Sequence, residues 1–154
     1  AIKELNLNVL QGNFNESQFD RDKYDLIVAW YFIEHHKDFL ATLDKIKSLL
    51  KKGGVLGLST PNTHGTSFLN NPVKYISKIP KDHFIEFSPR SLSLLLKNEG
   101  FRVEKIVMTG LHFDRFTQWF GVSLPKYRWL KQFVLWVLKM IRFGDTFEIY
   151  ARKL

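Results

Sequence analysis

The sequence predicts an α/β fold, in which helices pack against the faces of a β-sheet. The first observation is that strand-like and helix-like segments alternate along the chain, which is typical of this class. The second is the largely apolar run at residues 24–30 (YDLIVAW), which indicates a strand buried on both faces. A chain of 154 residues is long enough to bury a core as one domain.

The segments on either side of this strand come next. Residues 1–5 are expected to end a helix, and residues 7–10 to form a short strand that closes at residues 12–13. Apolar residues at helical spacing predict a helix from Asp38 to Leu50; they are Leu40, Leu43, Ile46, Leu49 and Leu50. Lys51 to Gly54 should stop this helix, because cations suit its negative end and glycine favours termination.

The middle of the chain contains a strand, a long excursion and a second helix. Residues 55–60 should form the strand, and residues 61–87 are an excursion rich in Asn, Thr, Gly and Pro. An excursion of this length in a compact domain is usually functional or mobile. The helix opens at Ser88 and Pro89, because serine is a good N-cap and proline is favoured at the first helical position. Gly100 should end it.

The last third of the chain is expected to hold two strands, at residues 101–108 and 146–151, with a helical insertion at residues 111–143 between them. The first part of the insertion, Leu111 to Leu124, is rich in phenylalanine and tryptophan. These side chains would form either an aromatic wall for an apolar ligand or part of a packed core.

The second part of the insertion, residues 126–143, predicts a basic amphipathic helix. Its apolar and basic residues occupy opposite faces: Leu130, Val134, Val137 and Ile141, widened by Phe133 and Met140, against Arg128, Lys131, Lys139 and Arg142. Trp129 and Trp136 are of the type found at lipid interfaces. Three interpretations remain open: a helix packed on the sheet with a solvated cationic face, contact with a membrane surface, and binding of RNA or another anionic partner.

Composition limits the classes of function. The net charge of +8 and the pI near 9.7 indicate attraction to an anionic partner, such as nucleic acid, a membrane surface or a charged substrate. The absence of cysteine excludes disulfides, cysteine zinc sites and thiol catalysis, and it suits a cytoplasmic protein. Residues 1–15 are polar and lack the apolar run of a signal peptide.

Several short phrases then carry a family resemblance. They are YDLI and IEH within residues 24–35, LLKKGG at 49–54, LSTPN at 58–62, HFIEFSP at 83–89 and NEGF at 98–101. In this order and spacing they resemble the class I S-adenosylmethionine-dependent methyltransferases, in particular the small-molecule branch that includes the ubiquinone-biosynthesis O-methyltransferases. The resemblance implies a Rossmann-like methyltransferase sheet and S-adenosylmethionine as cofactor.

The chain also departs from this family. Its members have a glycine-rich loop after their first strand, which cradles the cofactor, and an acidic residue at the end of their second strand; neither is found here. By the resemblance, residues 1–12 reach only the third strand, so the first two strands are absent and the edge of the 24–30 strand is left open. Residues 7–10 or another chain could pair there. We expect instead that residues 1–154 are a single incomplete methyltransferase domain, a fragment that binds cofactor poorly and is inactive alone.

Four residues are expected near the cofactor. By the resemblance, Asn13 and Phe14 lie where the adenine is held, and Ala29 and Trp30 lie where the strand faces the methionine end. Each pair has an alternative. Asn13 and Phe14 could simply form a turn, and Trp30 could be part of the core.

Three residues are expected to take part in catalysis. Transfer of a methyl group to a hydroxyl is easier once a base removes the proton, and histidine titrates near neutral pH, so His35 or His83 could be that base. Glu34 could orient it, or bind an acceptor hydroxyl or a metal. Alternatively, Glu34 and His35 belong to the turn that enters the helix at Asp38, and His83 is an ordinary loop histidine. The five histidines show no regular spacing, so no metal site is predicted.

The leading interpretation is an enzyme: the C-terminal part of an S-adenosylmethionine-dependent methyltransferase that acts on a small-molecule or lipid-like acceptor, at oxygen. The alternative is a non-catalytic methyltransferase-like module that binds a membrane surface or an anionic polymer through its basic helix. A nucleic-acid partner is disfavoured, because no RNA-binding motif is visible. We expect a cytoplasmic protein, with membrane association through residues 126–143 and self-association through the exposed strand edge as open alternatives.

Overall fold

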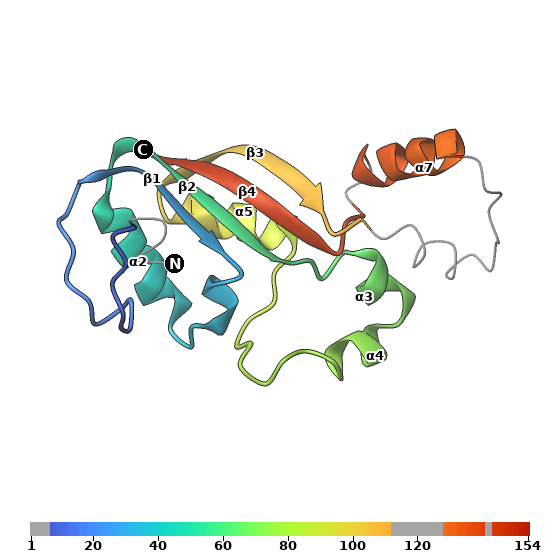
Figure 1. Ribbon diagram of the computed structural model, residues 1–154, viewed down its shortest axis with the longest axis horizontal. Helices are drawn as coiled ribbons and strands as arrows, with labels where there is room; N and C mark the ends of the chain where they lie inside the picture. Colours follow the sequence, from blue (N-terminus) through green and yellow to red (C-terminus); the bar gives the residue numbers. More distant parts are fainter. Residues whose placement is uncertain (1–6, 112–127, 141–142) are drawn as a thin grey trace.

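The computed structural model describes residues 7–111, 128–140 and 143–154, and within the helix at 128–140 it describes the side chains of Trp129, residues 132–137 and Met140. The predictions for residues 1–5 and for most of the aromatic segment after Leu111 lie outside these ranges. The elements in chain order are β1 (Tyr24–Trp30), the 3-10 helix η1 (Ile33–His35), α2 (Phe39–Leu49), β2 (Leu50–Pro61), α3 (Thr66–Asn70), α4 (Pro72–Ile76), α5 (Pro89–Asn98), β3 (Phe101–Thr109), α7 (Arg128–Met140) and β4 (Thr146–Lys153) (Figure 1).

The four strands form one mixed sheet in the order β1-β2-β4-β3. Strands β1 and β2 are parallel, while β4 runs antiparallel to both β2 and β3. Helix α2 connects the parallel pair, as expected for a crossover between parallel strands. The α/β class predicted from the alternation of elements is therefore confirmed.

Helices α2 and α5 cover the same face of the sheet (Figure 1). The core between them and the strands contains Leu43, Ile46, Leu92 and Leu96 from the helices and Leu56, Leu58, Phe101, Phe147 and Ile149 from the strands. Burial of these apolar side chains is the main force that holds the layers together. The antiparallel pairing of β2 with β4 places Leu58 opposite Ile149 on this face.

The prediction that strand 24–30 is buried on both faces is wrong. The side chains of Leu26, Val28 and Trp30, on the face opposite α2 and α5, are 56%, 51% and 44% exposed. A strand is buried on both faces only when other elements cover both faces of its sheet. The described elements cover one face of this sheet. Among the described residues, β1 is also paired on one side only, by β2.

The predicted strand at residues 7–10 is absent, since these residues have no regular structure. Leu7, Val9 and Leu10 are all more than half exposed. A strand needs a neighbour to satisfy its backbone N–H and C=O groups, and no described strand lies beside this segment. Local apolar content was therefore an insufficient signal.

The junction between α2 and β2 differs from the prediction in detail. Helix α2 is capped by Asp38, whose side chain accepts a hydrogen bond from the Ala41 N–H, and it ends at Leu49. Strand β2 begins at once with Leu50, so the glycines do not cap the helix. Instead Gly53, at φ +78°, lies where the register between β1 and β2 is irregular.

The excursion at residues 61–87 contains the short helices α3 and α4. It is fastened to the start of β4, because the Asn62 amide donates to the Gly144 carbonyl at 2.7 Å and the Asp145 carboxylate accepts from the hydroxyls of Thr66 and Ser67. Ser88 then caps helix α5, as predicted. Among the described residues, no helix is long and apolar enough to cross a bilayer.

Candidate functional site

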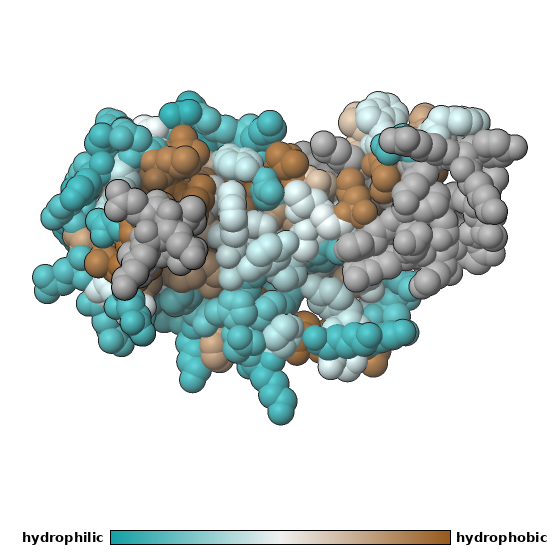
Figure 2. All heavy atoms as spheres, viewed as in Figure 1, coloured by the Kyte–Doolittle hydropathy of each residue, from teal (hydrophilic) through white to brown (hydrophobic). Residues whose placement is uncertain are grey.

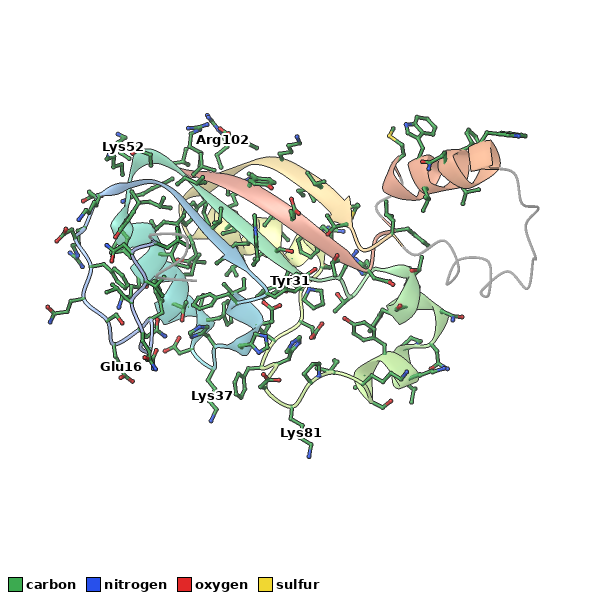
Figure 3. All side chains as sticks on the ribbon, in the orientation of Figure 1. Glu16, Tyr31, Lys37, Lys52, Lys81 and Arg102 are labelled. Carbon is green, nitrogen blue, oxygen red and sulfur yellow. The ribbon has the colours of Figure 1, made fainter. Side chains whose placement is uncertain are left out.

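The candidate site lies just past the carboxyl end of β1. Tyr31 follows the strand with a left-handed backbone (φ +49°), and its N–H donates to the Ser59 carbonyl of β2 at 2.8 Å. A positive φ is costly for a residue other than glycine, and such residues gather at functional sites. The chain then turns through η1, which presents Glu34 and His35. Figure 3 shows Tyr31 where the strand meets this turn.

Three side chains converge here: Glu34, His35 and His83. We call them the Glu-His-His cluster. One carboxylate oxygen and one ring nitrogen from each histidine all lie within 4.8 Å of one another. The rings of His35 and His83 meet edge to face, with centroids 4.6 Å apart. The cluster thus joins the end of β1 to the excursion that carries His83.

Glu34 is the most unusual member of the cluster. It is fully buried, and in the described part of the protein neither of its carboxylate oxygens has a hydrogen-bond partner. Burial is the main cause that raises the pKa of this carboxyl above its ordinary value of 4.5. A buried polar group without a partner is expensive, so Glu34 is suited to receive a ligand that the protein itself does not supply.

Two outer carboxylates hold the histidines in place. The Nδ1 atom of His35 lies 3.1 Å from Asp82, and the Nδ1 atom of His83 lies 2.7 Å from Glu86. Glu86 also accepts a hydrogen bond from the Tyr75 hydroxyl at 2.9 Å. A carboxylate on one ring nitrogen orients the imidazole and fixes which nitrogen carries the proton. In both histidines Nε2 is therefore the atom left for chemistry.

The sequence did not identify these outer residues. The spacing of His83 and Glu86, three residues apart, was a local signal that could have indicated their contact. Asp82 and Tyr75 gave no signal, because their partners are set by the path of the excursion. Burial, followed by the hydrogen bond to Glu86, raises the pKa of Tyr75, so its hydroxyl stays protonated.

Asn13 and Phe14, the residues predicted to hold adenine, contact other residues of the protein. The Asn13 side chain donates to Glu16 and accepts from the Asn15 N–H. The Phe14 ring packs against Phe19 and Phe32, with each pair of centroids 5.7 Å apart. Both residues belong to a turn that packs against α2.

The other two residues predicted to hold the cofactor point in opposite directions, because they are neighbours on a strand. Ala29 packs against the core, while Trp30 is exposed on the other face and meets Tyr150 edge to face. The four residues thus do not line one pocket in the described chain. The role of these four residues in binding S-adenosylmethionine stays a prediction.

A cavity of about 510 Å³ lies elsewhere, between the segment before β1 and the second half of α2. It is lined by Ser17, Gln18, Phe19, Arg21, Asp44, Lys45, Ser48 and Leu49. These residues come before β1 or from the end of α2, so the cavity lies at the opposite end of β1 from the Glu-His-His cluster. None of the predicted site residues lines it.

The donor set of the cluster also fits a divalent cation. One carboxylate and two imidazoles are ligands of Zn²⁺ and Fe²⁺ sites that keep open positions for substrate, and the outer carboxylates of Asp82 and Glu86 resemble the second shell of such sites. The sequence predicted no metal because the histidines lack regular spacing. The fold, rather than the spacing, brings the donors together.

Comparison with known proteins adds three findings. The family model described as a methyltransferase domain matches residues 4–106, which is more than half of the chain. The ubiquinone biosynthesis O-methyltransferase of Haemophilus ducreyi is 30% identical over 113 residues, which are 71% of this chain and 48% of that protein. The chain therefore spans about half the length of this curated relative.

Solved structures show the same fold. An S-adenosylmethionine-dependent methyltransferase from Thermotoga maritima matches with a TM-score of 0.67 at 18% identity, over 96% of this chain and 65% of its own. Phosphoethanolamine N-methyltransferase 2 from Haemonchus contortus, solved with S-adenosylmethionine, matches with a TM-score of 0.52 at 19% identity, over 90% of this chain and 35% of its own. At these identities the likeness concerns the fold alone.

Proposed function

Because this chain belongs to the methyltransferase domain family, which uses S-adenosylmethionine, we propose that it forms the acceptor side of a methyltransferase. The acceptor is a small or lipid-like molecule, methylated at oxygen. The curated relative is named for O-methylation in ubiquinone biosynthesis, which supports this choice. None of the relatives reported above is described as a non-catalytic module, so the alternative drawn from the sequence gains no support.

One observation carries the proposal: Glu34, His35 and His83 converge just past the carboxyl end of a parallel strand. In open α/β sheets this end of the strands is where ligands bind. The convergence joins residues from two separate segments. It brings a buried carboxyl and two oriented imidazoles next to one another.

The chemistry proposed for the histidines is proton transfer. The Nε2 atom of His35 or His83 accepts the proton of the acceptor hydroxyl, which makes the oxygen a better nucleophile. Asp82 and Glu86, on the opposite ring nitrogens, stabilise the imidazolium that forms. Glu34, whose pKa burial raises, forms a hydrogen bond with the acceptor hydroxyl and orients it.

A second role for the cluster is supported by the two unpartnered oxygens of Glu34. In that role the three side chains bind a divalent cation, and the cation takes the acceptor oxygen as a further ligand. The two roles predict different responses to chelators. Activity that survives a chelator favours the base, and activity lost to a chelator and restored by the cation favours the metal.

The proposal is tested in two steps. Calorimetric titration with S-adenosylhomocysteine, on this chain and on any longer natural chain that contains it, shows where the cofactor binds. Methyl transfer to a small phenol is then compared between the binding protein and its His35→Gln and His83→Gln variants, with His64→Gln, an exposed histidine outside the cluster, as control.

General acid–base catalysis typically contributes a factor of about 10²–10⁴, so the variant that removes the base should lose at least about a hundredfold. The His64→Gln control should keep its activity. Equal activity in all three variants would overturn the assigned role of the cluster. Failure of every chain to bind S-adenosylhomocysteine would overturn the proposal that the protein is part of a methyltransferase.

A further inference from the structure

Helix α7 carries a row of exposed apolar side chains. Trp129, Phe133, Trp136 and Met140 are 69%, 55%, 57% and 66% exposed. Their spacing of four, three and four residues places them on one side of the helix. The rings of Phe133 and Trp136 stack with centroids 6.1 Å apart. We call this row the aromatic stripe.

The aromatic stripe is not the side of α7 that packs on the protein. Among the described side chains of α7, those of Val134, Leu135 and Val137 are half-buried, and the helix contacts β3. Figure 1 shows α7 beyond the end of the sheet, apart from the other helices. Apolar and weakly polar side chains face outward at this end in Figure 2. The helix thus has an inner side and, separately, an exposed aromatic side.

The charge of the helix restricts what could cover the aromatic stripe. Arg128, Lys131 and Lys139 lie within α7, and the helix contains no Asp or Glu. The whole chain has a net charge of +8. An occupant with both apolar and anionic parts would satisfy the aromatic and the basic residues together. Anionic phospholipid has this chemistry.

We propose that α7 docks on the surface of a membrane that contains anionic lipid, with its aromatic stripe in the boundary between headgroups and acyl chains. A helix of 13 residues is about 20 Å long, which is sufficient to lie in this boundary. Tryptophan is enriched there, because its ring is apolar and its N–H can still reach water or headgroups. The positive charge of the helix adds attraction to the anionic surface.

A second copy of this chain is the less suitable occupant. Two molecules with a net charge of +8 repel each other at close range. A stable protein–protein interface buries about 800 Å² on each partner, which a row of four side chains does not provide. The inference does not rest on the proposed enzymatic function, because it uses only α7 and the charge of the chain.

The experiment is co-sedimentation of the chain with two kinds of vesicle. One kind contains phosphatidylglycerol and phosphatidylcholine in equal parts, and the other contains phosphatidylcholine alone. Wild type should bind the anionic vesicles more tightly, and added salt should weaken that binding. Far-ultraviolet circular dichroism of each variant shows that it is folded.

Three double variants separate the contributions. Trp129→Ala with Trp136→Ala removes the aromatic rings, and binding should fall by about tenfold or more. Lys131→Glu with Lys139→Glu should weaken binding to the anionic vesicles by a similar factor. The matched control, Lys52→Glu with Lys105→Glu, makes the same change in net charge at exposed sites outside α7 and should weaken binding much less.

Several results would overturn the proposal. Wild type that binds neither vesicle contradicts it, as does a tryptophan variant that binds as wild type does. Equal losses in the two lysine variants would show attraction by net charge without docking through α7. A wild-type dimer in sedimentation velocity that the tryptophan variant abolishes, without vesicle binding, would assign the stripe to self-association.

Discussion

The backbone N–H of Phe84 donates a hydrogen bond of 2.8 Å to the carbonyl of Glu34. Together with the pair between His35 and Asp82, this contact ties the excursion between β2 and α5 to the turn that follows β1. It places His83, the residue before Phe84, against His35. The imidazole of one segment is thereby held next to the carboxyl of another.

Glu34 should make the stability of the protein depend on pH. Because burial raises its pKa in the folded protein, the folded state is favoured while the carboxyl is protonated and loses stability as pH rises through the raised value. This loss begins above the ordinary value of 4.5. We expect Glu34→Gln, which is neutral at every pH, to flatten this part of the profile in thermal unfolding measured over a series of pH values.

The control for this prediction is Glu16→Gln, which changes an exposed carboxyl. It should leave the slope of the wild-type profile in place. A Glu34→Gln profile parallel to that of wild type would show that the Glu34 carboxyl gains a partner in solution.

Asp145 should be a major contributor to the stability of the excursion. Its carboxylate accepts hydrogen bonds from the Thr66 hydroxyl and from both the N–H and the hydroxyl of Ser67, at 2.7 to 2.9 Å. Asp145→Ala removes the acceptor of all three hydrogen bonds, and we expect a loss of about 3 kcal/mol in urea unfolding. Asp44→Ala, an exposed change, should stay within about 0.5 kcal/mol. Equal effects would contradict the anchoring role.

Gly65 should tolerate no side chain. A Cβ atom at this position would lie 2.7 Å from the Asp145 Cα and 2.8 Å from the Gly144 carbonyl oxygen, both of which are backbone atoms. Gly65→Ala should therefore cost about 1–3 kcal/mol of unfolding free energy, because the start of β4 has to shift. Asn70→Ala, at an exposed position of α3, provides the comparison. A neutral Gly65→Ala would mean that the two segments are less closely packed.

The Glu-His-His cluster should respond to zinc if it binds a cation. A cation that binds only the folded state stabilises it by about 2.7 kcal/mol at a hundredfold excess over its Kd. Added Zn²⁺ should then raise the melting temperature of wild type and of His64→Gln, but not of Glu34→Gln or His83→Gln. A rise of the same size in all four proteins would place the zinc elsewhere on the chain.

The sequence predicted the elements whose signals are local. Strand β1 and the helix that opens at Ser88 were found within a residue, because apolar runs and capping residues act over a few positions. The predicted strand at residues 7–10 failed, since a strand exists only with a partner. The exposure of Val28 was missed for the same reason, because it depends on what covers the sheet.

The candidate site was predictable in its residues and not in its arrangement. Glu34, His35 and His83 were each singled out from their positions around strands and helices. Their convergence depends on Asn62 and Asp145, which fasten the excursion to β4 from more than 75 positions apart in the chain. No local pattern encodes a contact over that separation. The pairing of Asp82 with His35 was invisible for the same reason, whereas that of Glu86 with His83 spans only three residues.

The one-sided sheet has a practical consequence for handling the protein. Along β1, a row of backbone N–H and C=O groups without a described neighbour runs beside the exposed side chains of Leu26, Val28 and Trp30. Ordered aggregates grow from this combination of open hydrogen-bonding groups and apolar surface. The strand that leads into the Glu-His-His cluster is thus also where precipitation would start in concentrated samples. Val28→Lys is the smallest change that would place a charge on this strand and oppose its pairing with another molecule.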